Sequence, residues 1–158
     1  MTYCPKNELF IATWNGNCDL VEALIVFGFD VDETDSEGKT PLMIATSLGN
    51  KELVQLLIDF KTDINLPSKN GCTPLIYAVL AGEKEIVELL LKNGADTGIK
   101  NDVNGYNALE LAIIYNLYDI AQLIIKHGGK VREEYVKGML FLMDKEMRNE
   151  YNELIEAS

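Results

Sequence analysis

The chain has 158 residues, and 47% of them are hydrophobic, which suits a folded protein with a buried core and argues against a disordered chain. Its formal net charge is −11, with 25 Asp and Glu residues against 14 Lys and Arg residues. Phosphate binding needs a basic footprint, so this charge argues against nucleic acid and an anionic membrane surface as partners. A protein partner with a basic surface is compatible with it.

The sequence repeats itself every 33 residues, and this period is its most informative feature. The triplet at 40–42, Thr-Pro-Leu, recurs at 73–75, and a fourth copy with one inserted residue has Asn-Ala-Leu at 107–109. Units of this length cannot bury their apolar faces alone, so they stack. The repeats are expected at 1–34, 35–67, 68–100 and 101–131, as one domain with a final segment at 132–158.

The second repeat, taken in chain order, predicts a turn, a short helix, a longer helix and an extended return. The turn occupies residues 35–39, and Thr40 then caps a helix whose first position suits Pro41. That helix should end at the glycine of Gly49-Asn50, and the second should run over about 51–60. Ala45 and its equivalent Ala78 are small, which lets the first helices of neighbouring repeats approach closely.

These features resemble the ankyrin repeat. The match is carried by G-x-T-P-L at 38–42 and 71–75 and by V-x-x-L-L-x-x-G-A-D at 87–96, and it covers roughly residues 7–131. The resemblance implies an all-α repeat solenoid of about four helix-turn-helix repeats joined by β-turn or hairpin loops. It also implies protein binding, although the family serves many partners on one scaffold.

The sequence departs from the family pattern at several positions. The first repeat begins at about Asn7 without the Thr-Pro-Leu triplet, as a terminal repeat would. The histidine that follows this triplet in the family and braces its turn is replaced by Met43, Ile76 and Glu110, so we expect less rigid turns. The fourth repeat has one extra residue within 100–105, and its loop should bulge.

Residues 132–158 lose the 33-residue pattern but keep apolar residues at helical steps of three and four. We expect them to form helices that cover the open end of the fourth repeat. The alternative is an amphipathic helix that binds a partner.

No pattern of catalytic, cofactor-binding or metal-binding residues is present, so a non-enzymatic protein is expected. The single histidine, His127, lies at the end of a predicted helix, and no phosphate-binding glycine loop occurs. The cysteines Cys4, Cys18 and Cys72 lack metal-ligand spacing, and their odd number indicates free thiols in a reducing compartment. Cys72, in a turn, is expected to be the most accessible. Neither a secretory signal nor a membrane-spanning run is found, so the expected location is the cytoplasm.

The candidate partner-binding residues are those that the resemblance assigns to a concave face, made by the turn tips and the ends of the first helices. Aromatic and aliphatic side chains with polar neighbours there are typical of a binding hot spot. Two of them have an alternative: Trp14 packing on the N-terminal segment around Tyr3, and Tyr115 packing under the C-terminal segment. The candidates are Trp14, Glu37, Lys39, Leu48, Leu80, Tyr106, Ile114 and Tyr115.

The sequence therefore predicts a protein-binding module, monomeric when free. Its short, acidic chain favours a stoichiometric inhibitor of a single partner, for example an immunity-type protein. An adaptor or scaffold is the alternative, and a small enzyme is a distant one.

Overall fold

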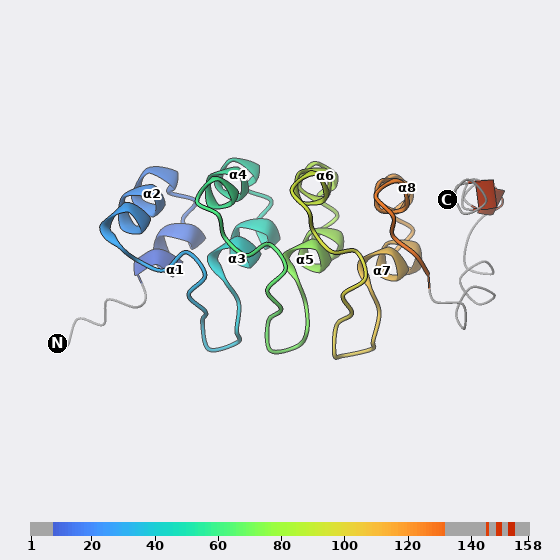
Figure 1. Cartoon of the computed structure of the whole chain (residues 1–158), viewed down its shortest axis with the longest axis horizontal. Coiled ribbons are helices and arrows are strands. Elements are labelled where there is room, and N and C mark those ends of the chain that lie inside the picture. The colour runs from blue at the N-terminus through green and yellow to red at the C-terminus, as the bar shows by residue number, and fades with distance from the viewer. Residues whose placement is uncertain (1–7, 132–144, 146–147, 150–151, 154–158) are drawn as a thin grey trace.

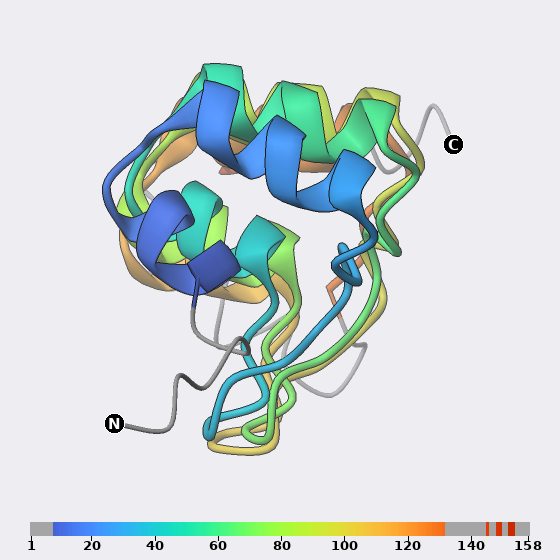
Figure 2. The same cartoon turned by 90° about the vertical axis from the view of Figure 1, so that its left-hand side faces the viewer.

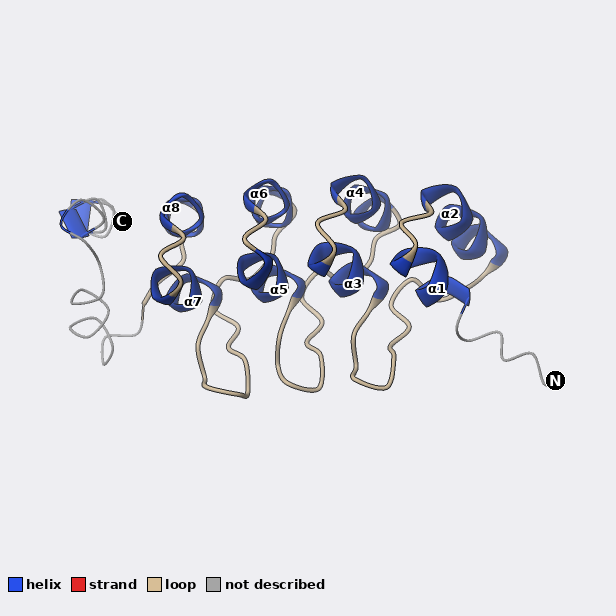
Figure 3. Cartoon of the chain, turned by 180° about the vertical axis from the view of Figure 1, so that it is seen from behind, coloured by secondary structure: helices blue, strands red, loops and turns tan. Residues whose placement is uncertain are grey.

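The computed structural model describes residues 8–131 together with Lys145, Arg148, Asn149, Asn152 and Glu153. Residues 8–131 form pairs of antiparallel helices stacked side by side (Figure 1). No strand is assigned in this part of the chain, and Figure 3 shows only helices and loops there. A single isolated antiparallel bridge joins Lys100 and Asn107 within these residues. The helices are α1 (Glu8–Trp14), α2 (Cys18–Phe27), α3 (Pro41–Ser47), α4 (Lys51–Asp59), α5 (Pro74–Ala81), α6 (Lys84–Lys92), α7 (Ala108–Ile114) and α8 (Tyr118–Lys126).

The helices lie in two layers, which we call the inner helices (α1, α3, α5, α7) and the outer helices (α2, α4, α6, α8). Each inner helix packs on the next inner helix and each outer helix on the next outer one. Ala45 and Ala78 are fully buried in this stack, in the middle of α3 and α5. The predicted all-α repeat solenoid, with small residues between the inner helices, is confirmed.

The starts of α3 and α5 follow the caps that the sequence predicts. The Thr40 hydroxyl oxygen accepts the backbone N–H of Met43 at 3.3 Å, and Thr73 accepts that of Ile76 at 3.4 Å. Each threonine is followed by a proline at the first helical position, where no intrahelical donor is needed.

The start of α7 is held differently, because the fourth repeat lacks Thr-Pro. Asn107 accepts the backbone N–H of Glu110 at 2.9 Å, and a Glu110 carboxylate oxygen accepts the N–H of Asn107 at 3.1 Å. Both side chains are buried, and together they form a capping box. Glu110 thus stands at the position of the family's histidine and holds the start of α7 through this capping box.

Three hairpin loops project from the row of inner helices, stacked one behind another (Figure 2). Adjacent loops share backbone hydrogen bonds: the N–H of Lys69 donates to the Glu37 carbonyl at 3.0 Å, and that of Asp102 to the Asn70 carbonyl at 2.8 Å. The third loop closes between the Asn101 N–H and the Tyr106 carbonyl, one residue wider than the second, which confirms the predicted bulge.

The predicted C-terminal cap at 132–158 lies outside the described residues, apart from five polar positions that are helical and exposed. Its role as a cover for the fourth repeat therefore remains a proposal.

Candidate functional site

Large apolar side chains are exposed at the C-terminal ends of the inner helices. Trp14 ends α1, Leu48 follows the last residue of α3, Leu80 lies in the last turn of α5, and Tyr115 follows α7. Their exposed fractions are 56%, 43%, 46% and 57%, in that order. Since the inner helices stack side by side, these residues follow one edge of the layer. We call them, together with the half-buried Ile114, the helix-end row.

A hollow of about 420 Å³ opens beside this row, between the α5–α6 and α7–α8 turns. Gly82, two residues after Leu80, and Asn116, directly after Tyr115, are among the residues that line it. Asn116 takes a positive φ of 55°, the conformation that Gly82 takes at the equivalent position in the third repeat. The hollow is open to solvent and could accept a side chain of a partner docked on the row.

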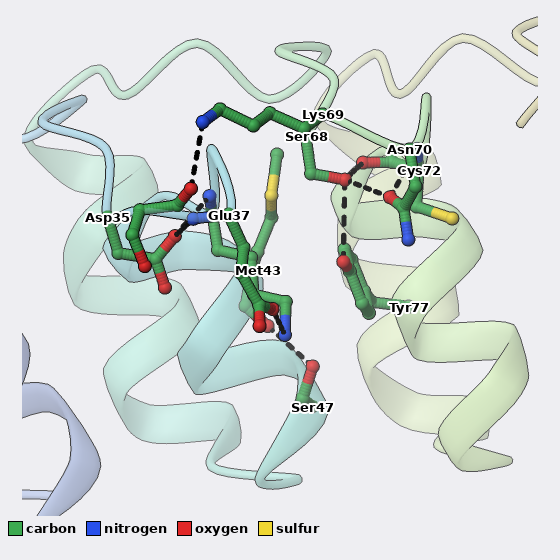
Figure 4. Close-up of polar contacts among 11 residues, drawn as sticks. Asp35, Glu37, Met43, Ser47, Ser68, Lys69, Asn70, Cys72 and Tyr77 are labelled. Atoms are coloured by element: carbon green, nitrogen blue, oxygen red, sulfur yellow. Dashed lines mark hydrogen bonds and ion pairs between the residues drawn. The ribbon is translucent and has the colours of Figure 1, made fainter. Parts of the chain in front are cut away.

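A second concave site, which we call the tip cleft, lies between the first two hairpin loops (Figure 4). It has a volume of about 310 Å³. Its walls come from the loop tips and its floor from α5, which contributes the ring of Tyr77. The lining residues are Ser36, Glu37, Lys39, Lys69, Asn70 and Tyr77.

Charge in the tip cleft is arranged around Lys39. The Lys39 ammonium lies 2.6 Å from a Glu37 carboxylate oxygen and 5.8 Å from the centre of the Tyr77 ring. The hydrogen bond to Glu37 raises the pKa of Lys39, partial burial opposes this, and the Tyr77 and Asp35 side chains add to it. Lys69 donates to the Ser36 carbonyl at 2.9 Å, which ties the two loop tips together (Figure 4).

Tyr77 is a residue of this site that the sequence analysis missed. It stands where the second repeat has Ile44, so its 33-residue equivalent is aliphatic and the repeat pattern describes it as core. In the structure it is half-buried, and its hydroxyl donates to the Ser68 hydroxyl oxygen at 3.4 Å. The sequence did contain a sign of this role, because a tyrosine with a polar hydroxyl group stands at a position where packing requires only an aliphatic side chain.

The structure separates the candidate residues into two groups. Glu37 and Lys39 lie in the tip cleft, before the N-terminus of α3, whereas the helix-end row lies at the opposite ends of the inner helices. A helix of seven residues such as α3 spans about 10 Å. Tyr106 belongs to the third loop, is half-buried against the core, and does not line the tip cleft. A partner would have to cover both edges of the layer to contact all eight candidates.

Cys72 and His127, which the sequence analysis considered as possible reactive groups, lie in different environments. The prediction that Cys72 is accessible is wrong: it is 5% exposed, and burial, with a contribution from Asp102, raises the pKa of its thiol. His127 is exposed at the end of α8, with its Nδ1 atom 2.8 Å from the Leu123 carbonyl oxygen. Among the described residues, no three His, Cys, Asp or Glu side chains are grouped so as to hold a metal ion.

Comparison with models of protein families identifies the type of repeat. A family model described as ankyrin repeats (3 copies) matches residues 9–101, which is more than half of the chain. The chain belongs to the ankyrin-repeat family. The matched range covers the pairs from α1–α2 to α5–α6, and the α7–α8 pair repeats their arrangement beyond it. No curated protein shows significant sequence similarity to the chain.

Ankyrin repeats are generally protein-protein interaction modules and are typically non-enzymatic. The hollow beside the helix-end row is lined by the turns and the starts of α6 and α8, and the tip cleft by the hairpin loops and α5. No helix in the described part of the chain is long and apolar enough to cross a membrane.

Proposed function

We propose that this ankyrin-repeat protein is a non-enzymatic inhibitor that binds one protein partner through the helix-end row and the hairpin tips. The observation that carries the proposal is the row itself. Four large apolar side chains, one per repeat, are about half-exposed along a single edge of the layer. Apolar and aromatic side chains with polar neighbours are the residues that dominate binding energies at protein interfaces.

The charge of the chain supports a partner with a basic surface. At a net charge of −11, the protein attracts a cationic partner over long distances and repels a second copy of itself. A reducing compartment such as the cytoplasm is supported by the free cysteines, Cys18 and Cys72, in the described residues. We therefore place the free protein there as a monomer.

Inhibition is favoured over an adaptor role because the helix-end row and the tip cleft lie at opposite ends of short inner helices, about 10 Å apart along α3, within reach of a single partner. A partner that spans the helix-end row and the tip cleft would cover both concave sites at once and leave neither for a second protein. An adaptor would need two surfaces that are occupied simultaneously. The proposal therefore predicts complexes with one partner per chain.

The test compares capture of proteins from the source cells by the wild type and by variants of the helix-end row. Trp14→Ala and Tyr115→Ala truncate two anchors of the row, and Gln55→Ala is the control, since Gln55 is exposed on the outer helix α4. We expect a partner whose affinity falls about thirtyfold, equivalent to about 2 kcal/mol, in each variant of the row and stays unchanged in the control. A partner that binds all the folded variants equally would contradict the proposal. Inhibition is tested separately, by measuring the activity of the captured partner after one molar equivalent of the wild-type protein is added.

A further inference from the structure

The N-terminal end of the stack exposes a face that every later repeat buries. Ile11 and Leu20 are 57% and 44% exposed, whereas their 33-residue equivalents, Ile44 and Leu53, are 1% and 0% exposed. The later positions are covered because α1 packs on α3 and α2 packs on α4. The face of α1 and α2 therefore has the shape that receives a neighbouring helix pair, without a helix pair in front of it among the described residues. It holds a hollow of about 200 Å³ lined by Glu8, Ile11, Leu20 and Leu24.

The charged side chains of the described part of the first repeat have one sign. Residues 8–34 contain six carboxylates and neither Lys nor Arg. Asp19, the second residue of α2, is exposed, and it forms no ion pair with any basic side chain of the described residues. An apolar hollow with Glu8 in its lining and Asp19 directly before Leu20 suits an occupant with an apolar stripe and basic flanks.

The interior of the stack indicates where the positive charge of such an occupant belongs. The Lys51 ammonium, at the start of α4, lies 2.6 Å from Glu85 of α6, and the Lys84 ammonium, at the start of α6, lies 2.9 Å from Asp119 of α8. In both pairs a lysine of the preceding outer helix meets the acid at the second position of the next one. Asp19 occupies that acidic position in α2, and among the described residues no outer helix precedes α2 to supply the lysine.

We propose that the N-terminal end face, made by Ile11, Asp19, Leu20 and Leu24, binds a basic amphipathic helix of a protein partner, with a Lys or Arg of that helix beside Asp19. The helix lies where a preceding outer helix would lie and covers the apolar hollow with its apolar stripe. This surface is separate from the helix-end row and the tip cleft, so the inference goes beyond the function proposed above. It agrees with one partner per chain when the helix belongs to the same partner.

Two other occupants fit less well. A second copy docked face to face brings the same carboxylates and no cation, so like charges meet. At the other end of the described stack, α8 begins with Tyr118 where α4 and α6 begin with lysine, so its start offers no cation for Asp19 of a second copy. The remaining candidate is this chain's own segment 1–7, whose single basic residue is Lys6.

The test uses the full chain and two fluorescein-labelled synthetic helices of about 18 residues, or five turns. Both have the same leucine stripe, and one has lysine flanks where the other has glutamate. We expect saturable binding of one lysine helix per chain by fluorescence anisotropy and no binding of the glutamate helix. Asp19→Lys and Leu20→Gln should each weaken it about tenfold or more. The matched controls Glu52→Lys, at the position equivalent to Asp19, and Val103→Gln, at an exposed apolar residue of the third loop, should stay within about twofold.

Several outcomes would overturn the inference. Equal affinity of the Asp19→Lys and Glu52→Lys variants, or binding of the glutamate helix, would show that the face does not select a basic helix. A gain of about tenfold or more on deleting residues 2–7 would make that segment the occupant. A concentration-dependent dimer that Leu20→Gln dissociates would make a second copy the occupant.

Two further measurements keep the result clear. Circular dichroism melts check that each variant folds, and Ile11→Gln replaces Leu20→Gln if the latter does not fold. Leu80→Ala, in the helix-end row, should leave the lysine helix bound. Loss of binding in Leu80→Ala but not in Leu20→Gln or Ile11→Gln would show that the lysine helix binds the helix-end row. That result would overturn the inference about the end face and leave the proposed function standing.

Discussion

Thr13 and Thr46 stand 33 residues apart at the same position of α1 and α3, and only Thr13 has a hydrogen-bond acceptor for its hydroxyl. The Thr13 hydroxyl donates to the Leu9 carbonyl at 2.7 Å, four residues earlier in the helix. The Thr46 hydroxyl oxygen is fully buried and has no partner. An unsatisfied buried hydroxyl costs about 1–3 kcal/mol, so the second repeat carries a local defect in the core.

Replacing Thr46 with valine should therefore raise the free energy of unfolding by about 1 kcal/mol, because a methyl group of similar shape needs no hydrogen bond. The third repeat already has a buried valine, Val79, at this position. Urea denaturation measures the change, with Thr13→Val as the control that loses a hydrogen bond. A less stable Thr46→Val protein would mean that the Thr46 hydroxyl has an acceptor.

Lys61 takes a left-handed conformation, with φ of 63°, where the third repeat has Gly94 with φ of 87°. A side chain costs about 1–2 kcal/mol in this region, while glycine adds entropy to the unfolded chain. Lys61→Gly should raise the free energy of unfolding by about 0.5–1 kcal/mol. Gly94→Ala is the reverse experiment, since a Cβ there meets no atom within 4 Å and only the backbone conformation would be penalised. The argument fails if both variants shift the midpoint in the same direction.

Removing the Glu110 carboxylate should loosen the start of α7. Glu110→Ala leaves the buried N–H of Asn107 without its acceptor, and we expect a loss of about 1–2 kcal/mol in the free energy of unfolding. Glu110→Gln keeps an oxygen in the same place and should cost less. Thermal melts and hydrogen exchange of the α7 amides provide the comparison, and equal losses in the two variants would exclude the capping box as the cause.

Overpacking between inner helices is tested by Ala78→Leu. Ala78 is fully buried in α5, which contacts both α3 and α7, so a larger side chain should lower the free energy of unfolding by about 1–3 kcal/mol. Ala81 lies three residues later in the same helix and is exposed, which makes Ala81→Leu a matched control. Similar unfolding midpoints for the two leucine variants would contradict the packing described here.

The two described thiols should differ in reactivity. Burial raises the pKa of Cys72 and so lowers its thiolate fraction, whereas Cys18 is half-buried near the start of α2. A short pulse of N-ethylmaleimide at neutral pH, followed by peptide mapping, should label Cys18 before Cys72, and in denaturant the difference should disappear. The fold favours the neutral Cys72 thiol and so raises its pKa. The contribution of this thiol to the free energy of unfolding is therefore fully present below the pKa of the unfolded thiol, and it is lost as the pH rises through the pKa of the folded thiol. Faster labelling of native Cys72 would contradict its burial.

Features that are set within a single repeat are predicted well from the sequence. Features that depend on which repeats lie next to it are predicted less well. Thr40, Pro41 and Ala45 act within their own repeat or against an identical copy, so the 33-residue step locates them correctly. Ile11 and Ile44 are the same residue at the same position, and only their places in the stack make one exposed and the other buried.

The candidate site follows the same division. The exposure of the helix-end row follows from the register of each inner helix, which the repeat pattern supplies. The tip cleft does not, because the Lys39–Tyr77 contact joins two repeats through the packing of adjacent loops. Glu110 was interpreted through the family's histidine rather than through its own spacing from Asn107, although Asn-x-x-Glu is a capping-box pattern.

The hydrogen bonds between adjacent loops have a consequence for the speed of association. Because the Lys69 amide is held by the Glu37 carbonyl and the Asp102 amide by the Asn70 carbonyl, one loop tip cannot swing away without breaking a bond to its neighbour. The spacing of the contact points is thus set before any partner arrives, and little conformational freedom remains to be lost on docking. Association should then be limited by collision and orientation, at about 10⁵–10⁷ M⁻¹s⁻¹ before electrostatic steering, with no slow rearrangement phase.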